Sequence, residues 1–186
     1  MNAISRRLSL VGLFVSGVCV VVYAADRLTL DMEKSRIDFV GTKPTGLHRG
    51  GFERFTVDAA ADWGDLSKSR FKVDIDATSL WSDNNGLTNH LKNSDFFDVS
   101  RYPTISFETT RIDLGNAKIA VVNGTLTMLG KAMEIAVPCS VDVTDGSLKT
   151  ECDFKIDRTR WGMTYGRGRV DEEVEIAVRL VFGRSP

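Results

Sequence analysis

The feature of this sequence that most constrains its fold is a period-two alternation of apolar and polar side chains. It occupies residues 37–39, 55–63, 71–77, 105–107, 135–143, 148–156 and 174–182. In an extended strand, successive side chains point to opposite faces, so each of these segments has one apolar face and one polar face. Such segments predict an antiparallel sheet that buries one side and leaves the other side in water.

One segment, residues 83–99, breaks the alternation. Leu87 and Leu91 within it are spaced four apart, as on one face of a helix. We expect a short helix and turn there, which caps the sheet rather than joining it. Turn signals that separate the alternating segments are found at 64–65, 130–131 and 145–146.

About eight strands with one apolar face each can close in two ways. A sandwich fills its core with interleaved side chains from two sheets, whereas an eight-stranded barrel can leave room for one small ligand. The alternation is the same in both architectures, so it does not choose between a sandwich and a barrel.

The composition fits one folded domain and argues against several classes of function. The 186 residues are enough for one domain with a sizeable core. The 24 basic and 25 acidic residues leave no positive excess for a phosphate backbone, which argues against a nucleic-acid partner. Three cysteines and two histidines do not supply a zinc ribbon, and no serine sits in a nucleophile elbow. We therefore assign no catalytic residue, no metal and no cofactor.

The N-terminal segment has the pattern of a secretory signal peptide. Arg6 and Arg7 precede an apolar run over residues 8–25 that contains a Val-Tyr-Ala sequence, typical of a cleavage site. We expect a signal peptide of residues 1–24 and a mature domain of residues 25–186, located in the periplasm or secreted. The alternative is an uncleaved membrane anchor, although 18 apolar residues are at the short limit for a membrane span.

Five motifs occur in order along the mature chain. They are SRIDF at 35–39, HLKNSDFFDV at 90–99 with YPTISF at 102–107, GTLTMLG at 124–130, DR at 157–158 with WGM at 161–163, and VDEEV at 170–174. Together they resemble the YceI-like family of bacterial polyisoprenoid-binding proteins, over essentially the whole mature chain. The chain departs from the family pattern at Arg160 and Trp161, where an acidic residue and a phenylalanine are more usual.

The resemblance implies an all-β fold: an eight-stranded antiparallel, lipocalin-like barrel with a short capping helix. It also implies an apolar interior that takes a long lipid, such as a polyisoprenoid, an isoprenoid quinone or a similar amphiphile, for storage or transport in the cell envelope. Any contact with the membrane is expected to be transient, and the formation of a homodimer is left open. The alternatives are an enzyme acting on a lipid-like substrate in the same cavity, and a solid barrel that serves as an interaction module.

Candidate ligand-binding residues follow from the alternation and the resemblance together. The alternation places seven apolar side chains inside the barrel, and the resemblance makes that inside hollow. The seven are Phe39, Phe71, Val73, Ile75, Ile105, Phe107 and Phe154. Trp161 is a further candidate. Four arginines cluster around it and Tyr165; the default interpretation is a solvated loop, and the sharper hypothesis is a basic rim that holds a carboxylate, phosphate or quinone oxygen. These arginines are Arg158, Arg160, Arg167 and Arg169.

The histidines and nearby acids have competing interpretations. His90 is a candidate for hydrogen bonding to a ligand head group, and the alternative is a structural role in capping the helix. A metal site made by His48, His90 and Asp95 has a weak signal, because the two histidines are far apart in the sequence. We interpret Asp95 and Asp98 as turn and cap acceptors rather than as a catalytic pair of carboxylates.

The last expectation concerns a disulfide between Cys139 and Cys152. A two-residue turn at 145–146 sets a hairpin register that pairs inward residues with inward residues. The pairs are Val143–Leu148, Val141–Thr150, Cys139–Cys152, Val137–Phe154 and Ile135–Ile156. The cysteines fall at a non-hydrogen-bonded site, where Cα atoms lie about 4.5 Å apart, within reach of a disulfide. The alternative is two buried, unbridged thiols, and a three-residue loop would shift the register by one residue.

Overall fold

Strands account for most of the computed structural model, which describes residues 26–116, 119–144 and 147–184. The signal peptide expected at residues 1–24 lies outside the described residues. The strands are β1 (Asp26–Leu30), β2 (Arg36–Lys43), β3 (Gly46–Phe52), β4 (Phe55–Ala61), β5 (Arg70–Asp76), β6 (Leu80–Ser82), β7 (Thr104–Leu114), β8 (Ile119–Met128), β9 (Lys131–Thr144), β10 (Ser147–Asp157) and β11 (Glu173–Arg184). The helices are α1 (Asn85–Lys92) and the 3₁₀ helices η1 (Leu66–Lys68), η2 (Ala77–Ser79) and η3 (Arg158–Trp161).

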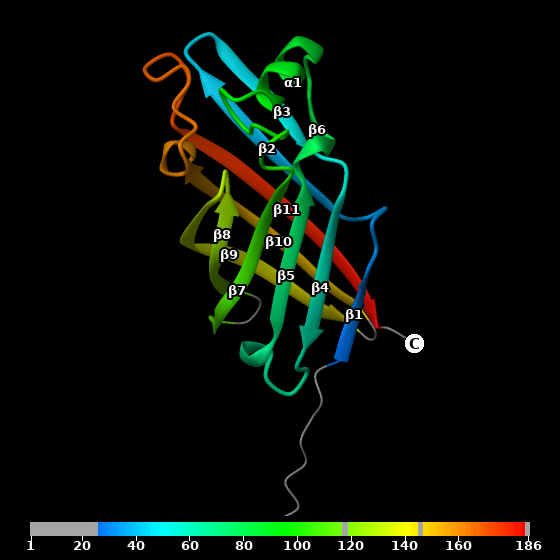
Figure 1. Cartoon of the computed structure of the whole chain (residues 1–186). Coiled ribbons are helices and arrows are strands. Elements are labelled where there is room, and N and C mark those ends of the chain that lie inside the picture. Colours follow the sequence, from blue (N-terminus) through cyan, green and yellow to red (C-terminus); the bar gives the residue numbers. More distant parts are fainter. Residues whose placement is uncertain (1–25, 117–118, 145–146, 185–186) are drawn as a thin grey trace, which may run out of the picture.

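Eight of the strands form a closed antiparallel barrel (Figure 1). Hydrogen-bonded neighbours follow in the order β1, β4, β5, β7, β8, β9, β10 and β11, and β11 pairs with β1 to close the ring. Each strand of the ring therefore pairs with a neighbour on both sides over at least part of its length. The predicted eight-stranded antiparallel barrel is therefore confirmed, and the sandwich alternative is excluded.

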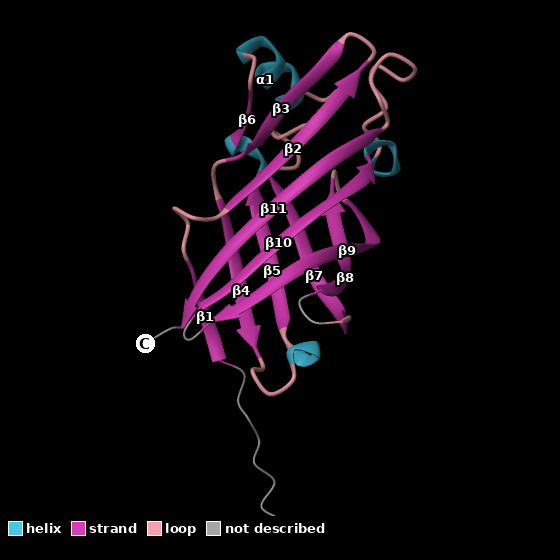
Figure 2. Cartoon of the chain, turned by 180° about the vertical axis from the view of Figure 1, so that it is seen from behind, coloured by secondary structure: helices cyan, strands magenta, loops and turns pink. Residues whose placement is uncertain are grey.

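Strands β2, β3 and β6 extend the sheet beyond the ring, at the end that carries α1 (Figures 1 and 2). The extension exists because β11 is long enough to take two partners along one edge. Residues 174–179 of β11 pair with β2, and residues 182–184 pair with β1. The barrel wall is therefore deeper on this side than on the side of β7 and β8.

The helix α1 starts at a side-chain cap. Asn84 precedes the helix, and its side-chain oxygen accepts a hydrogen bond from the amide of Leu87 at 2.9 Å. Leu91 is buried in the main core, and Leu87 packs against that core. The expected short helix within residues 83–99 is confirmed. In the part of the chain that the structure describes, no helix is long and apolar enough to cross a membrane.

The hairpin of β9 and β10 has the predicted register over its first part. Its ladder pairs Val143 with Leu148 and ends at Cys139–Cys152. The two further expected pairs, Val137–Phe154 and Ile135–Ile156, do not form. Beyond the cysteines, β9 stays paired only with β8 and β10 only with β11, because η3 folds back against β9 and the indole of Trp161 donates to the carbonyl of Leu126 in β8 at 3.1 Å.

Candidate binding cavity

The barrel is hollow. Its interior holds a cavity of about 750 Å³, a volume typical of sites for small molecules and cofactors. The lining runs from Lys43 and His48 at the β2–β3 turn to Leu114 and Val143, near the β7–β8 and β9–β10 turns. Since these turns lie at opposite ends of the molecule (Figure 1), the cavity extends along the whole barrel.

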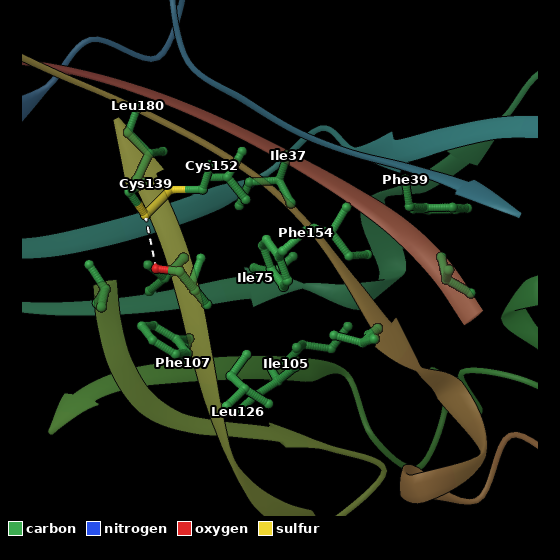
Figure 3. Close-up of a pocket in the computed structure, with 18 of the residues that line it drawn as sticks. Ile37, Phe39, Ile75, Ile105, Phe107, Leu126, Cys139, Cys152, Phe154 and Leu180 are labelled. Atoms are coloured by element: carbon green, nitrogen blue, oxygen red, sulfur yellow. Dashed lines mark hydrogen bonds between the residues drawn. A yellow bond between two sulfur atoms is a disulfide. The ribbon is translucent and has the colours of Figure 1, made fainter. Parts of the chain in front are cut away.

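All seven side chains that the alternation places inward line this cavity. Phe39, Phe71, Val73, Ile75, Ile105, Phe107 and Phe154 are all part of its wall. Figure 3 shows Ile75, Ile105 and Phe107 facing the same space as Phe154 on the opposite wall. Ile75 and Ile105 are direct partners across β5 and β7, so their neighbouring side chains form one continuous apolar surface.

Further phenylalanines close the cavity at the end that carries α1. Phe52, Phe96 and Phe97 all line it. The ring of Phe97 lies 5.8 Å from that of Phe52 and 6.3 Å from that of Phe39, between centroids. The alternation did not identify these residues, because Phe96 and Phe97 follow α1 in a turn without any period. The signal that could have found them is the apolar Phe-Phe pair directly after the capping helix.

Two glycines set how the aromatic rings lie along the wall. A Cβ built on Gly124 would overlap the ring of Phe107, and one built on Gly50 would overlap the ring of Phe39. Each ring therefore lies flat across the backbone of a neighbouring strand and does not project to the middle of the cavity. Glycine is needed at both positions because a backbone and a ring approach each other closely there.

The two histidines are held by separate carboxylates. The Nε2 atom of His90 lies 2.9 Å from Asp95, and the Nδ1 atom of His48 lies 2.8 Å from Asp83. The backbone N–H of Arg49, followed by the His48 side chain, lowers the pKa of the Asp83 carboxyl below its ordinary value. The metal arrangement of His48, His90 and Asp95 is thus not assembled, and no group of three metal-ligating side chains occurs among the described residues.

His90 also belongs to an aromatic cluster at the edge of the cavity. Its ring packs edge-on against Phe96 at 5.1 Å and against Tyr165 at 4.8 Å. The contact ties α1 to the loop between η3 and β11.

Asp98 lies in the turn after α1 with a positive φ of 42°, and its carbonyl accepts from the amide of Tyr102 at 2.8 Å. This is a turn role, remote from paired-carboxylate chemistry.

Trp161 does not line the cavity, which differs from the sequence expectation. Its side chain is completely buried in the wall between η3 and β8, where its N–H is already bonded to Leu126. Arg160 stacks over its ring at 5.4 Å, away from the lumen. Residues 158–172, between β10 and β11, have no period-two pattern, so the alternation could not tell which of them point inward.

Arg158 is the one member of the expected basic rim that lines the cavity in the described structure. Its side chain is only 4% exposed, and it donates hydrogen bonds to the backbone carbonyls of Asp171, Met163 and Val170. Burial lowers the pKa of this guanidinium from its ordinary value. The hydrogen bonds close the loop of residues 162–172 over the end of the barrel.

Cys139 and Cys152 are joined by a disulfide in the cavity wall (Figure 3). Their Cα atoms lie 4.2 Å apart, as the non-hydrogen-bonded site in the register requires. The bridge crosses the last pair of the β9–β10 ladder, immediately before the two strands part. The disulfide therefore links β9 and β10 covalently at the point where the hydrogen bonding between them ends.

Comparison with known proteins identifies related sequences and folds. The profile of the YceI-like domain matches residues 28–182. A UPF0312 protein of Vibrio campbellii is 32% identical over 90 residues, which are 48% of this chain and 47% of the relative. A UPF0312 protein of Pseudomonas putida is 35% identical over 81 residues, or 44% of this chain and 42% of the relative. The aligned region thus spans about half the length of these curated relatives.

Solved structures show the same fold. BcnA of Burkholderia cenocepacia superposes with a TM-score of 0.75 at 24% identity, covering 82% of this chain and 99% of that chain. A polyisoprenoid binding domain from Saccharophagus degradans superposes with a TM-score of 0.67 at 14% identity, covering 88% of this chain and all of that domain. At these identities the likeness shows a shared barrel architecture.

Proposed function

Because the chain belongs to the YceI-like family, we propose that it binds a long-chain apolar lipid inside the barrel and stores or carries it in the cell envelope. The ligand class is a polyisoprenoid, an isoprenoid quinone or a similar amphiphile. The observation that carries this proposal is the continuous apolar cavity, which runs from one end of the barrel to the other. A solid interaction module would have a filled interior.

The energetics of burial favour a long hydrocarbon chain. Moving about 400 Å² of apolar ligand surface out of water at about 25 cal/mol per Å² contributes about 10 kcal/mol. Association opposes this with a cost of roughly 4–15 kcal/mol. A net affinity in the micromolar range or tighter therefore needs a cavity that exists before the ligand arrives. The closed barrel supports this requirement, because its wall is fixed by strand pairing around the full ring.

The comparisons support binding rather than catalysis. The solved domain from Saccharophagus degradans is described as polyisoprenoid binding, and its barrel has the same architecture as the one described here. Inside the cavity, the described lining is dominated by aliphatic and aromatic side chains. Such a lining favours retention of a hydrocarbon over acid–base chemistry on it.

The test is native mass spectrometry of the purified protein, combined with extraction and identification of any lipid that it carries. The double variant Ile75→Trp/Phe107→Trp adds bulk at two inward positions and should lower the occupancy by that lipid. The matched control is Lys72→Trp/Glu108→Trp, which places the same bulk on exposed positions of the same two strands. Equal occupancy in the two double variants would contradict binding inside the barrel.

A further inference from the structure

The two ends of the cavity differ in charge. At the α1 end, Lys43 and Arg158 line the cavity together with both histidines. At the opposite end, the charged lining residue among those described is Asp142, near the β9–β10 turn. The wall between these ends is formed mainly by apolar side chains, including Ile75, Phe107 and Phe154 (Figure 3). Among the described lining residues, an amphiphile in this cavity therefore meets cationic groups at the α1 end only.

Arg158 is the most deeply buried of these polar groups. It is 4% exposed, and its Nε atom donates to the carbonyl of Asp171 at 3.0 Å. One N–H of each terminal nitrogen donates to Met163 or to Val170. A guanidinium has five N–H groups, so these three bonds leave two donors for another acceptor.

The positive charge of Arg158 has no ion-pair partner among the described residues. The two carboxylates whose charges act on Arg158 are bonded to other groups: Glu172 to Arg167, and Asp157 to Thr159. Of the other acids at this end of the barrel, Asp95 is bonded to His90 and Asp171 to Thr42. Backbone carbonyls supply partial charges only. A buried cation without a counter-ion is costly, and an acceptor oxygen brought by a ligand would offset that cost through charge-assisted hydrogen bonds.

We propose that Arg158 anchors the head of the bound amphiphile, and that this head carries acceptor oxygens, most favourably as a carboxylate. The lipid then lies with its head at the α1 end and its tail toward the β7–β8 and β9–β10 turns. This inference rests on the proposed function and adds the orientation of the ligand and the chemistry of its head. The ring of Phe96 lies beside this site, with its centroid 6.0 Å from the Arg158 guanidinium carbon, and His90 and Tyr165 pack against that ring.

The experiment compares three ligands with one chain length and different heads: palmitate, hexadecanol and hexadecylamine. Each displaces the uncharged fluorescent probe N-phenyl-1-naphthylamine from the delipidated, full mature protein at neutral pH. We expect palmitate to bind roughly tenfold more tightly than hexadecanol, from the strength of hydrogen bonds to charged groups, and hexadecylamine to bind most weakly. If the three ligands bind equally, or if the amine binds best, the head-group site is wrong while lipid binding stands. If none of them binds, the proposed function itself fails.

Variants within η3 test the residue directly. In Arg158→Gln the preference for palmitate over hexadecanol should disappear, while hexadecanol still binds. Arg160→Gln is the matched control, because Arg160 lies two residues away in the same 3₁₀ helix and packs on Trp161 outside the cavity. A preserved preference in folded Arg158→Gln would overturn the assignment. If that variant does not fold, as judged by circular dichroism, the three-ligand comparison on the unaltered protein decides.

Discussion

At the scale of single residues, the space inside the barrel depends on two glycines, which carry no side chain. Gly50 and Gly124 have no Cβ, and the rings of Phe39 and Phe107 occupy the positions where a Cβ would lie. The rings contribute apolar surface to the wall, and they take little of the cross-section. The width of the cavity is thus set by two glycines as much as by the large residues that touch a ligand.

The variant Gly124→Ala tests this account. The added methyl would overlap both the ring of Phe107 and the backbone carbonyl of Glu108, so we expect the ring to move into the cavity and the free energy of unfolding to fall by about 1–3 kcal/mol. Urea denaturation and lipid occupancy measure the two effects. Gly183→Ala in β11 is the control, since a Cβ there meets nothing within 4 Å. Equal stability of the two variants would contradict the close approach at Gly124.

Asp157 is the N-cap residue of the 3₁₀ helix η3, and its carboxyl makes the stability of the protein depend on pH. Its side chain accepts hydrogen bonds from the hydroxyl and the amide of Thr159, and these bonds lower the pKa of Asp157 below the ordinary 3.8. The stability that Asp157 contributes is therefore complete above its ordinary pKa and is lost as the pH falls through the lower, folded value. We expect Asp157→Asn to lose less stability than the unaltered protein between about pH 5 and about pH 2, measured by urea denaturation. An identical acid dependence in both proteins would argue against this role of the cap.

At the scale of secondary-structure elements, the Cys139–Cys152 disulfide joins β9 and β10 at the end of their hydrogen-bonded ladder. Beyond the disulfide, the two strands are not hydrogen-bonded to each other. Reduction of the disulfide should therefore let the strands separate at this point. For a loop with a sequence separation of 13 residues, we expect reduction to lower the free energy of unfolding by roughly 3 kcal/mol. Thiol titration of the denatured, unreduced mature protein should find no free thiol. Two free thiols would rule out the bridge.

The hairpin also shows how far the sequence can predict this fold. Period-two alternation identified the inward side chains from Phe39 to Phe154, because a strand has only two faces and one of them must be buried. The turn at 145–146 set the register correctly as far as Cys139. Neither the alternation nor the turn predicts where β9 and β10 separate, because that position depends on the packing of η3 and Trp161 against β8 and β9. Because neither signal covers residues 158–172, Trp161 was expected among the ligand-binding residues, and the buried position of Arg158 was not foreseen.

At the scale of the whole molecule, the disulfide and the predicted signal peptide both favour an oxidising compartment outside the cytoplasm. We propose that the mature protein is exported to the periplasm or secreted, because structural disulfides persist in oxidising compartments. N-terminal sequencing of the protein from its native host should begin at Ala25 or next to it. An intact Met1 on a membrane-bound product would instead identify the segment as a retained anchor.

Pairing of β1 with β11 has a consequence for the order in which the protein can be made. The first and the last strand of the described chain are neighbours, and β11 also borders β2 and β10. Synthesis delivers the chain from its N-terminus, so the ring stays open until β11 arrives. Such non-local pairing is slow to form. The lipid proposed above can therefore enter a closed barrel only after β11 has joined the ring, and a chain truncated before β11 would leave the ring open between β10 and β1.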